Sequence, residues 1–359
     1  MKIGIIIWRM AFSGAENVAN ALIQQFKKDG HDVHIMLTST SDMPKGVENV
    51  HNLTYGGNKF LRIIRRSIGI RRVANKEKFD VVVGFGHIDS IHMIRALLFS
   101  RIPKVACERM DPATYPFKST QRTERDILYK LLDGIILQTN RQKEFYDAYL
   151  NVKSVAIPNP VRAVNYKAVA VNERKKEFVT VARLDNAQKN HLFMFECFME
   201  FDRHNQGYVL KVYGDGPDRS MYASYIKEHH MEGKIILCGK VSEPQKHIRE
   251  AQIFLLTSNH EGMPNALIEA MALGMPCIST RCGGGGPEDL IVNGKNGYLV
   301  DMNDKAGFVR MMESLAQSEE LQCEIGSEAE KITEQLSIEK VAAKWIEAFH
   351  SFIGDNEKC

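Results

Sequence analysis

The chain has 359 residues, of which 44% are hydrophobic and 25% are charged. These values are ordinary for a globular protein and exclude a disordered, collagen-like or coiled-coil chain. The formal net charge of +3 at pH 7 is too small to indicate a nucleic-acid-binding protein unless positive residues cluster, which they do once. Because domains run to roughly 150 residues, the length predicts two domains, and we expect chemistry in a cleft between them.

The cysteines favour a reducing compartment. They are odd in number, scattered, and form no CxxC pair, so we expect neither a zinc site nor a disulfide framework. They are Cys107, Cys197, Cys238, Cys277, Cys282, Cys323 and Cys359. The apolar run at the start has no small-residue cleavage site and predicts a buried strand, not a secretion signal. No stretch approaches the roughly 18 apolar residues of a transmembrane helix, so we expect a cytoplasmic protein whose membrane contact is peripheral.

Residues 1–157 alternate short apolar runs with longer amphipathic segments. This alternation is typical of an α/β domain, in which helices cover both faces of a parallel sheet. The expected strands are 3–8, 33–37, 81–85, 104–107, 134–138 and 154–158.

Prolines and a charged run over 158–176 then interrupt the pattern, as a linker does. The alternation restarts and predicts a second parallel α/β domain. Its expected strands are 178–184, 209–214, 234–239, 252–258, 276–280 and 297–300. We therefore predict domains at 1–160 and 161–336, followed by 337–359, a terminal helix that packs near the domain junction.

Residues 258–291 are the most informative segment. Pro264 stands where the first helical position is expected, and Gly274 stands where a helix stop is expected, which predicts a short helix over 265–273. The start of this helix points out of the carboxyl edge of the sheet. Its backbone N–H groups and its positive dipole end favour an anion there, such as a phosphate.

Two carboxylates, Glu261 and Glu269, flank this helix start. A carboxylate repels a phosphate, so both are better suited to accept hydrogen bonds from hydroxyl groups, for example on a ribose and on a second sugar. A diphosphate with a sugar on each side meets that description. The alternative is that Glu269 makes a local salt bridge and Glu261 is a solvated loop residue, which is the commoner fate of an isolated glutamate.

Further motifs lie at the ends of other strands of this domain. Arg183 and Lys189 follow its first strand, where two cations can neutralise a diphosphate, although they can equally be solvated surface residues. The glycine run that includes Gly285 allows close approach of the backbone to a ligand, or is a plain flexible turn. Gly239 is expected on the same rim. The glycines around Gly216 lack the third glycine of a dinucleotide fingerprint and do not support NAD binding.

Two residues of the first domain are candidates for the site, Gly14 for donor binding and His87 on the acceptor side. Gly14 opens an amphipathic helix and lets the backbone approach a phosphate or an acceptor. His87 follows an apolar strand and is a candidate base or positioning residue, although a lone histidine is more often structural.

Together these residues resemble the bacterial family 4 retaining glycosyltransferases over nearly the whole chain. The segments that carry the resemblance are SGAE (13–16), ERMDP (108–112), ARLDNAQKN (182–190), YGDGP (213–217), GGPEDLI (285–291) and the pair of glutamates with GMPNALI between them. The resemblance implies a GT-B fold, in which the second domain holds a nucleotide sugar and the first holds the acceptor, with no metal or other cofactor required. The ERMDP (108–112) and EGMPN (261–265) forms of two of these motifs resemble those of enzymes that build capsule, exopolysaccharide or O-antigen.

The resemblance also implies roles for single residues. Arg183 and Lys189 would hold the diphosphate, Glu269 the nucleotide ribose, and Glu261 the hydroxyls of the donor sugar. The backbone of Gly262, Met263, Pro264 and Asn265 would contact the sugar and phosphate. Such enzymes retain the anomeric configuration, and front-face attack needs no enzyme nucleophile. One departure is Ser13, where many relatives have glycine.

The cluster of positive charge lies at residues 59–76, which contain seven Lys or Arg residues and no acidic residue. Aliphatic residues interleave with the basic ones, which predicts a cationic amphipathic helix suited to an anionic membrane surface. Nucleic acid is a weaker alternative, because no DNA- or RNA-binding motif is present and few aromatic residues interleave. The third interpretation is a solvated face of a helix packed on the sheet.

We therefore predict a retaining, metal-independent hexosyltransferase at the inner face of the plasma membrane. It would move a hexose or N-acetylhexosamine from a nucleotide sugar, with UDP favoured by the resemblance alone, to a polyprenyl-diphosphate-linked glycan. A sugar-nucleotide epimerase shares the architecture and is one alternative. A non-catalytic nucleotide-sugar-binding protein is the other.

Overall fold

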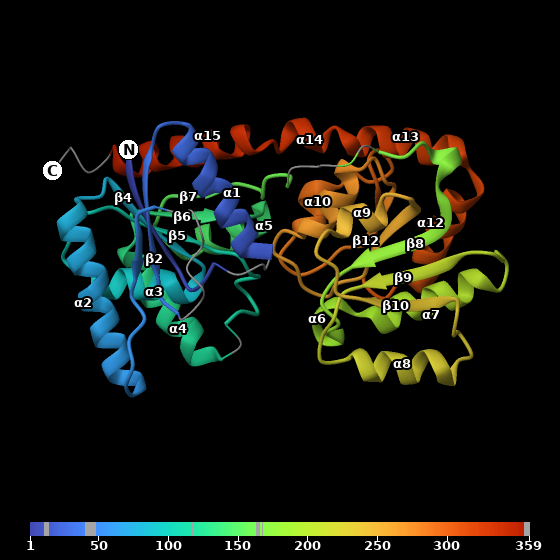
Figure 1. Ribbon diagram of the computed structural model, residues 1–359, viewed down its shortest axis with the longest axis horizontal. Coiled ribbons are helices and arrows are strands. Elements are labelled where there is room, and N and C mark those ends of the chain that lie inside the picture. The colour runs from blue at the N-terminus through green and yellow to red at the C-terminus, as the bar shows by residue number, and fades with distance from the viewer. Residues whose placement is uncertain (11–13, 40–47, 117, 163–165, 167, 355–359) are drawn as a thin grey trace. The chain divides into compact units, whose positions relative to one another are not determined.

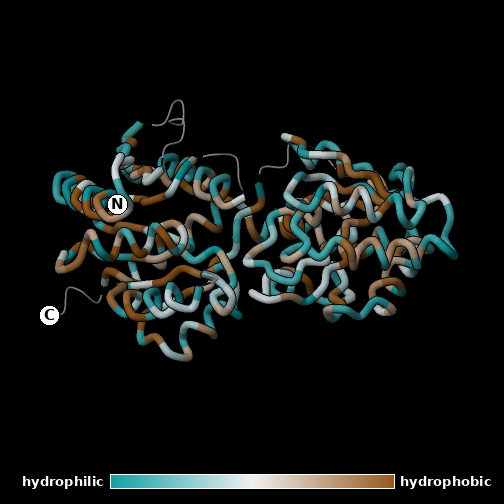
Figure 2. The backbone as a smooth tube through the Cα atoms, turned by 90° about the horizontal axis from the view of Figure 1, so that it is seen from below, coloured by the Kyte–Doolittle hydropathy of each residue, from teal (hydrophilic) through white to brown (hydrophobic). Residues whose placement is uncertain are grey.

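The computed structural model describes residues 1–10, 14–39, 48–116, 118–162, 166 and 168–354 (Figure 1). The chain forms two compact units. The first unit comprises Met1–Pro160 together with the segment from Ile338 onward, and the second unit comprises Val161–Ser337. Within each unit the hydrophobic segments run through the interior, while hydrophilic segments form the outer loops (Figure 2).

A seven-stranded sheet forms the centre of the first unit, in the order β3-β2-β1-β4-β5-β6-β7. Every pair of neighbours is parallel. The strands are β1 (Lys2–Ile7), β2 (Asp32–Leu37), β3 (Val50–Asn52), β4 (Val81–Phe85), β5 (Lys104–Cys107), β6 (Gly134–Leu137) and β7 (Ser154–Ala156). The inner strands are apolar on both faces because helices cover both.

The helices of the first unit divide between the two faces. They are α1 (Gly14–Lys28), α2 (Lys59–Glu77), α3 (His87–Ala96), α4 (Ser119–Leu128), α5 (Asn140–Asp147) and α15 (Ile338–Ile353), with a short 3-10 turn, η1, at Tyr129–Leu131. On one face, Val82 of β4 shares a core with Ile70 of α2 and Met93 of α3. On the other face, Phe85 stacks on Trp345 of α15 with ring centroids 6.2 Å apart.

A six-stranded parallel sheet forms the second unit, in the order β10-β9-β8-β11-β12-β13. Its strands are β8 (Lys175–Val181), β9 (Val209–Tyr213), β10 (Ile235–Gly239), β11 (Ala251–Leu256), β12 (Cys277–Thr280) and β13 (Tyr298–Val300). The helical segments are η2 (Val171–Glu173), α6 (Asn186–Lys189), α7 (His191–Asp202), α8 (Arg219–Glu228), α9 (Pro244–Ile248), α10 (Asn265–Ala272), α11 (Gly286–Leu290), α12 (Lys305–Gln317), α13 (Glu319–Glu330) and α14 (Ile332–Gln335).

Aromatic side chains fill the core of the second unit. Phe178 of β8 lies edge-on to Phe201 of α7, with ring centroids 5.0 Å apart, and Tyr208 packs against both rings. Edge-to-face pairs of this kind add about 0.5–1.5 kcal/mol beyond the burial of their area. They fix α7 on the sheet and thereby the loop that precedes it.

The predicted α/β architecture with two parallel sheets is confirmed, and most predicted strands agree with the observed ones within a few residues. The edge strand β3 was not predicted, because three residues are too few to show a period. The short helix predicted over 265–273 is observed at Asn265–Ala272, and Pro264 is its N-cap and not its first helical residue. In the described part of the chain, no helix is both long and apolar enough to cross a membrane.

Candidate active site

Two neighbouring strands of the second unit bring the predicted residues together. β8 and β11 pair in parallel, so the loops that follow them leave the same edge of the sheet. The two loops are held together by hydrogen bonds. Asn259 N–H donates to the carbonyl of Gln188 over 2.8 Å, and the hydroxyl of Thr257 donates to the carbonyls of Lys189 and Asn190 over 3.1 Å each.

Lys189 and Glu261 form an ion pair across these loops. Nζ of Lys189 contacts Oε1 of Glu261, and the side chains are 16% and 8% exposed. The hydroxyl of Ser258 donates to the same Oε1 over 2.6 Å. Glu261 is therefore an oriented, largely desolvated carboxylate with an ammonium beside it, and such charge-assisted contacts are stronger than neutral hydrogen bonds.

The glycine run after β12 packs against the loop that carries Glu261. Glu261 N–H donates to the carbonyl of Gly283 over 2.8 Å. Gly285, with φ +77°, is the N-cap of α11. Gly286 lies against the backbone carbonyl of Gly262, where any side chain would overlap the oxygen. This close backbone packing requires glycine at position 286, and it fixes the position of the loop formed by residues 261–264.

Glu269 lies inside α10, whose start carries the positive end of the helix dipole. Among the described residues, no hydrogen-bond donor reaches its carboxylate. Burial raises the pKa of Glu269, and the positive charge of Arg162 opposes that shift. The other end of α10 is fixed by Arg174, whose Nη2 donates to the carbonyls of Leu273 and Gly274 over 3.1 and 3.0 Å.

The remaining predicted residues of the second unit lie in the same loops or at the end of a strand further along the sheet. Gly262, Met263 and Pro264 are buried and lead into α10, and Asn265 begins it. Arg183 is exposed in the loop after β8. Gly239 ends β10, and its carbonyl accepts the Gly214 N–H over 2.9 Å.

In the first unit, Gly14 begins α1, whereas the neighbouring Ser13 falls outside the described residues. His87 begins α3 at the carboxyl end of β4. Its ring lies edge-on to Tyr115, and its buried Nδ1 has no hydrogen-bond partner among the described residues. Burial and the charge of Arg125 lower the pKa of His87 to about 4. The ring is therefore neutral at neutral pH and a weak base, which fits positioning better than proton abstraction.

Glu108 of the ERMDP segment lies in a buried polar cluster beside His87, whose contacts were not predicted. Tyr129 donates its hydroxyl to Glu108, and burial raises the pKa of that carboxyl. Nη1 of Arg125 donates to the carbonyls of Pro112 and Tyr115 over 2.9 and 2.8 Å and so holds the loop after β5. The sequence signal for Glu108 was its place directly after an apolar strand.

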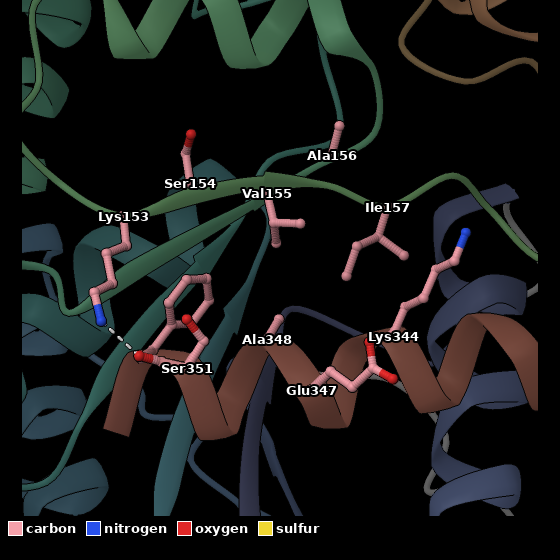
Figure 3. A pocket seen from close by; sticks show the side chains of 10 residues that line it. Lys153, Ser154, Val155, Ala156, Ile157, Lys344, Glu347, Ala348 and Ser351 are labelled. Atoms are coloured by element: carbon pink, nitrogen blue, oxygen red, sulfur yellow. Dashed lines mark hydrogen bonds between the residues drawn. The ribbon is translucent and has the colours of Figure 1, made fainter. Parts of the chain in front are cut away.

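A groove in the first unit contains none of the predicted residues. It lies between edge strand β7 and α15 and has a volume of about 680 Å³ (Figure 3). Lys153 spans one end, where its Nζ donates to the carbonyl of Ser351 over 2.6 Å. Val155, Ile157 and Phe352 give it apolar lining, whereas Lys344 and Glu347 are charged.

Family models match both units of the chain. Residues 162–332 match the model described as "Glycosyl transferases group 1", and residues 12–163 match the model described as "Glycosyltransferase Family 4". The crystal structure of Anabaena Alr3699/HepE in complex with UDP and glucose is similar over 98% of this chain and 100% of that chain, with a TM-score of 0.82 and 15% identity. The fold is therefore GT-B.

Two curated relatives match along nearly their whole length. The chain is 31% identical over 383 residues to "N-acetyl-alpha-D-glucosaminyl L-malate synthase" of Bacillus anthracis, covering 99% of this chain and 98% of the relative. It is 23% identical over 358 residues to "GalNAc-alpha-(1->4)-GalNAc-alpha-(1->3)-diNAcBac-PP-undecaprenol alpha-1,4-N-acetyl-D-galactosaminyltransferase" of Campylobacter jejuni, covering 96% and 97%. The chain belongs to this glycosyltransferase family, with a family 4 unit followed by a group 1 unit, and it is a glycosyltransferase.

Proposed function

We propose that this protein is a retaining transferase that moves a hexose or N-acetylhexosamine from a UDP-sugar to a polyprenyl-diphosphate-linked glycan of a cell-surface polysaccharide. The acceptor class is supported by the Campylobacter jejuni relative, whose name contains PP-undecaprenol. The donor class is supported by the HepE structure, which is a complex with UDP and glucose.

The observation that carries this proposal is the contact between Lys189 and Glu261 beside the start of α10, with Glu269 buried in the same helix. Lys189 and the exposed Arg183 supply positive charge for a diphosphate. Glu261 faces the same space as an acceptor for sugar hydroxyls. Glu269 lacks a donor in the described protein, and a ribose hydroxyl would satisfy it.

Transfer proceeds at one face of the donor sugar. The bond between its anomeric carbon and the diphosphate oxygen breaks, and the acceptor hydroxyl oxygen bonds to that carbon from the same side. The acceptor proton passes to the departing phosphate oxygen. Arg183 and Lys189 stabilise the negative charge that develops on the leaving group, which is the task a metal ion performs in other enzymes, so we propose metal-independent transfer.

Helix α2 supports docking at an anionic membrane surface. Phe60, Ile64 and Ile68 form an exposed apolar stripe at helical spacing, and Phe60 is 71% exposed. Phe99, in the loop after α3, is 92% exposed. Nη1 of Arg71 donates to the carbonyl of Leu98 over 3.4 Å and ties that loop to α2. Basic and apolar groups on one surface suit the inner leaflet of the plasma membrane, where a lipid-linked acceptor resides.

The basic residues of α2 do not all face outward. Nη2 of Arg66 donates to the carbonyl of Thr38 over 2.5 Å, and its Nη1 lies 2.6 Å from Nε2 of His92. Arg66 therefore ties α2 to α3 and to the residue after β2, whereas Arg65, Arg71 and Arg72 remain exposed for anionic lipid.

A second candidate acceptor is a small dicarboxylate such as L-malate. It is favoured by the Bacillus anthracis relative, whose name joins N-acetylglucosamine to L-malate. This acceptor would use the same donor site, so the two candidates differ only at the first unit.

The first experiment is calorimetric titration of UDP, GDP, ADP and NAD into the full-length protein and into Lys189→Ala, with a chelator present. We expect UDP to bind best and the variant to bind it more weakly, because an ammonium beside the diphosphate is lost. Preference for GDP would move the donor to a GDP-sugar. Binding of NAD alone, or of no nucleotide, would overturn the proposed donor site.

The second experiment offers UDP-sugars with a polyprenyl-diphosphate-linked sugar or with L-malate and follows the product by NMR. We expect transfer to the lipid-linked sugar with the donor's anomeric configuration. Exclusive transfer to L-malate would replace the acceptor class, an inverted product would refute retention, and conversion of the donor without an acceptor would favour an epimerase.

A further inference from the structure

A cluster of metal-ligating side chains lies in the first unit, on strands that the nucleotide site does not use. His34 is on β2 and His51 is on β3. Met36 pairs with His51 in the parallel register, and His34 lies two residues before Met36, so both histidines project from the same face of the sheet. Glu77, the last residue of α2, meets them there.

The two imidazole rings face each other with a nitrogen of each ring in contact. Nδ1 of His34 lies 3.0 Å from Nε2 of His51, and the rings are stacked with centroids 5.3 Å apart. The edge of Phe79 packs on His34, which is 6% exposed. A neutral imidazole is the form that binds metal.

Carboxylates surround the pair. Nε2 of His34 lies 3.2 Å from Oδ1 of Asp32, which directs the ring hydrogen of His34 to Nε2 and leaves Nδ1 with its lone pair. The ligand atoms offered by His34, His51 and Glu77 all lie within 4.8 Å of one another. Glu77 is held by Lys2, whose Nζ lies 2.8 Å from Oε2. The Lys2 side chain is 29% exposed, so it can swing toward solvent.

We propose that His34, His51 and Glu77 bind one divalent transition-metal ion of the Zn²⁺ type. Two nitrogens bound to one tetrahedral zinc ion lie about 3.3 Å apart, from Zn–N distances of about 2.0–2.1 Å, close to the observed separation. Two imidazoles and one carboxylate form a ligand set that zinc accepts, with water in the fourth position.

Binding rearranges only local hydrogen bonds. Without metal, one ring hydrogen lies between Nδ1 of His34 and Nε2 of His51. The ion takes its place, and His51 carries its ring hydrogen on Nδ1. Asp32 stays on Nε2 of His34 as the carboxylate that orients a metal-bound histidine. The ion replaces Lys2 as the partner of Glu77.

The site has a structural role, because its ligands come from β2, β3 and the end of α2. It clamps the short edge strand β3 and the basic helix to the sheet. The ligands lie in the first unit, whereas Lys189, Glu261 and Glu269 lie in the second unit. Metal removal is therefore expected to lower the stability of the first unit without preventing UDP binding in the presence of chelator. If the protein does not bind Zn²⁺, the proposed transferase function is unaffected.

The test titrates Zn²⁺ into the metal-free full-length protein against a chromophoric chelator and follows thermal unfolding with and without Zn²⁺. Wild type is expected to bind one Zn²⁺ per chain and to unfold at a higher temperature when it is bound. His51→Asn should lose this site. His230→Asn, which changes an exposed histidine at a left-handed position that suits asparagine, should retain it.

Two further variants keep the test decisive if His51→Asn folds poorly. Glu77→Gln removes the charged ligand and should abolish the stabilisation by Zn²⁺. Asp32→Asn changes only the orienting carboxylate and should weaken Zn²⁺ binding about 10–100-fold. Substitution with Co²⁺ should give a tetrahedral visible absorption band that His51→Asn lacks. Absence of stoichiometric Zn²⁺ binding by wild type, or equal binding by wild type and His51→Asn, would overturn the proposal.

Discussion

Ser258 donates its hydroxyl to Oε1 of Glu261 over 2.6 Å, and that same oxygen contacts the ammonium of Lys189. The carboxylate is thus fixed by one neutral and one charged donor before any ligand arrives. Oε1 is occupied by these two donors, and we propose that Oε2 accepts the hydroxyls of a donor sugar. We expect substitutions of Ser258, Glu261 and Lys189 to affect turnover and UDP binding differently.

Glu261→Gln should lower kcat/KM for a UDP-sugar by about 100-fold or more, the usual cost of losing a group that acts at the reacting centre. It should not weaken the binding of UDP alone, because Lys189 is then free for the diphosphate. Steady-state kinetics and calorimetry together check this. Ser258→Ala, which leaves the ion pair in place, should cost about tenfold in kcat/KM. A parallel loss of UDP affinity in Glu261→Gln would contradict the assigned roles.

Glu269→Gln should weaken UDP binding by about tenfold or more, because a hydrogen bond to a charged acceptor is worth about 1.5–3 kcal/mol. Dideoxy-UDP, which lacks the ribose hydroxyls, should bind wild type and variant equally. Since burial raises the pKa of Glu269, UDP affinity of wild type should fall as the pH drops through that pKa. Glu324→Gln, on an exposed face of α13, is the matched control.

Gly286→Ala should destabilise the second unit by about 1–3 kcal/mol, the usual cost of overpacking, because the new methyl group overlaps the carbonyl of Gly262. Activity should fall with it, since this contact sets the loop that carries Glu261. Gly56→Ala adds the same methyl group where no atom lies within 4 Å and should be close to neutral. Urea unfolding of both variants measures the difference, and equal stability would show that the turn can relax.

Arg65, Arg71 and Arg72 changed together to Ser should abolish flotation of the protein with vesicles that contain anionic lipid, and high salt should have the same effect on wild type. Phe60→Ser with Phe99→Ser should also reduce flotation, because the apolar anchors are lost.

Lys227→Ser with Arg310→Ser removes exposed charges from the second unit and serves as the control for flotation. Binding that survives the triple substitution in α2, or that is lost equally in the control, would refute docking through this helix.

Asp89 should make stability depend on pH. Thr38 donates its hydroxyl to the buried carboxyl over 2.7 Å, and burial raises the pKa of Asp89 to about 7. The folded protein therefore holds a proton that the unfolded chain releases near pH 4. As the pH rises from about 4 to about 7, the contribution of Asp89 to the free energy of unfolding falls by up to about 1.4 kcal/mol per pH unit.

Asp89→Asn should remove the fall in the free energy of unfolding that Asp89 causes between about pH 4 and about 7. Burial lowers the pKa values of His87 and His92 to about 4. Their contribution to the free energy of unfolding therefore rises with pH between about pH 4 and about 6.5, opposite to that of Asp89. They remain in both proteins, so the difference between the two urea-unfolding profiles isolates Asp89. An unchanged profile would show that the carboxyl is ionised in the folded protein.

Local sequence patterns predicted every strand except β3, the start and stop of α10 and the basic helix, because hydrophobic period, proline and glycine act within a few residues. The sequence also placed Lys189 and Glu261 at strand ends. It could not show that they meet, since they are 72 positions apart and their contact depends on β8 lying beside β11.

Which residues of a repeating pattern face inward depends on the packing of elements that are distant in the chain. The helical spacing of α2 does not distinguish Arg65 from Arg66, yet Arg66 donates to the carbonyl of Thr38, the residue directly after β2, whereas Arg65 is exposed. The three-residue strand β3 carries no period of its own, and its pairing with β2 is what brings His51 to His34. Local patterns fix local conformation, whereas ion pairs and ligand clusters arise from contacts between segments that only the order of strands in the sheet brings together.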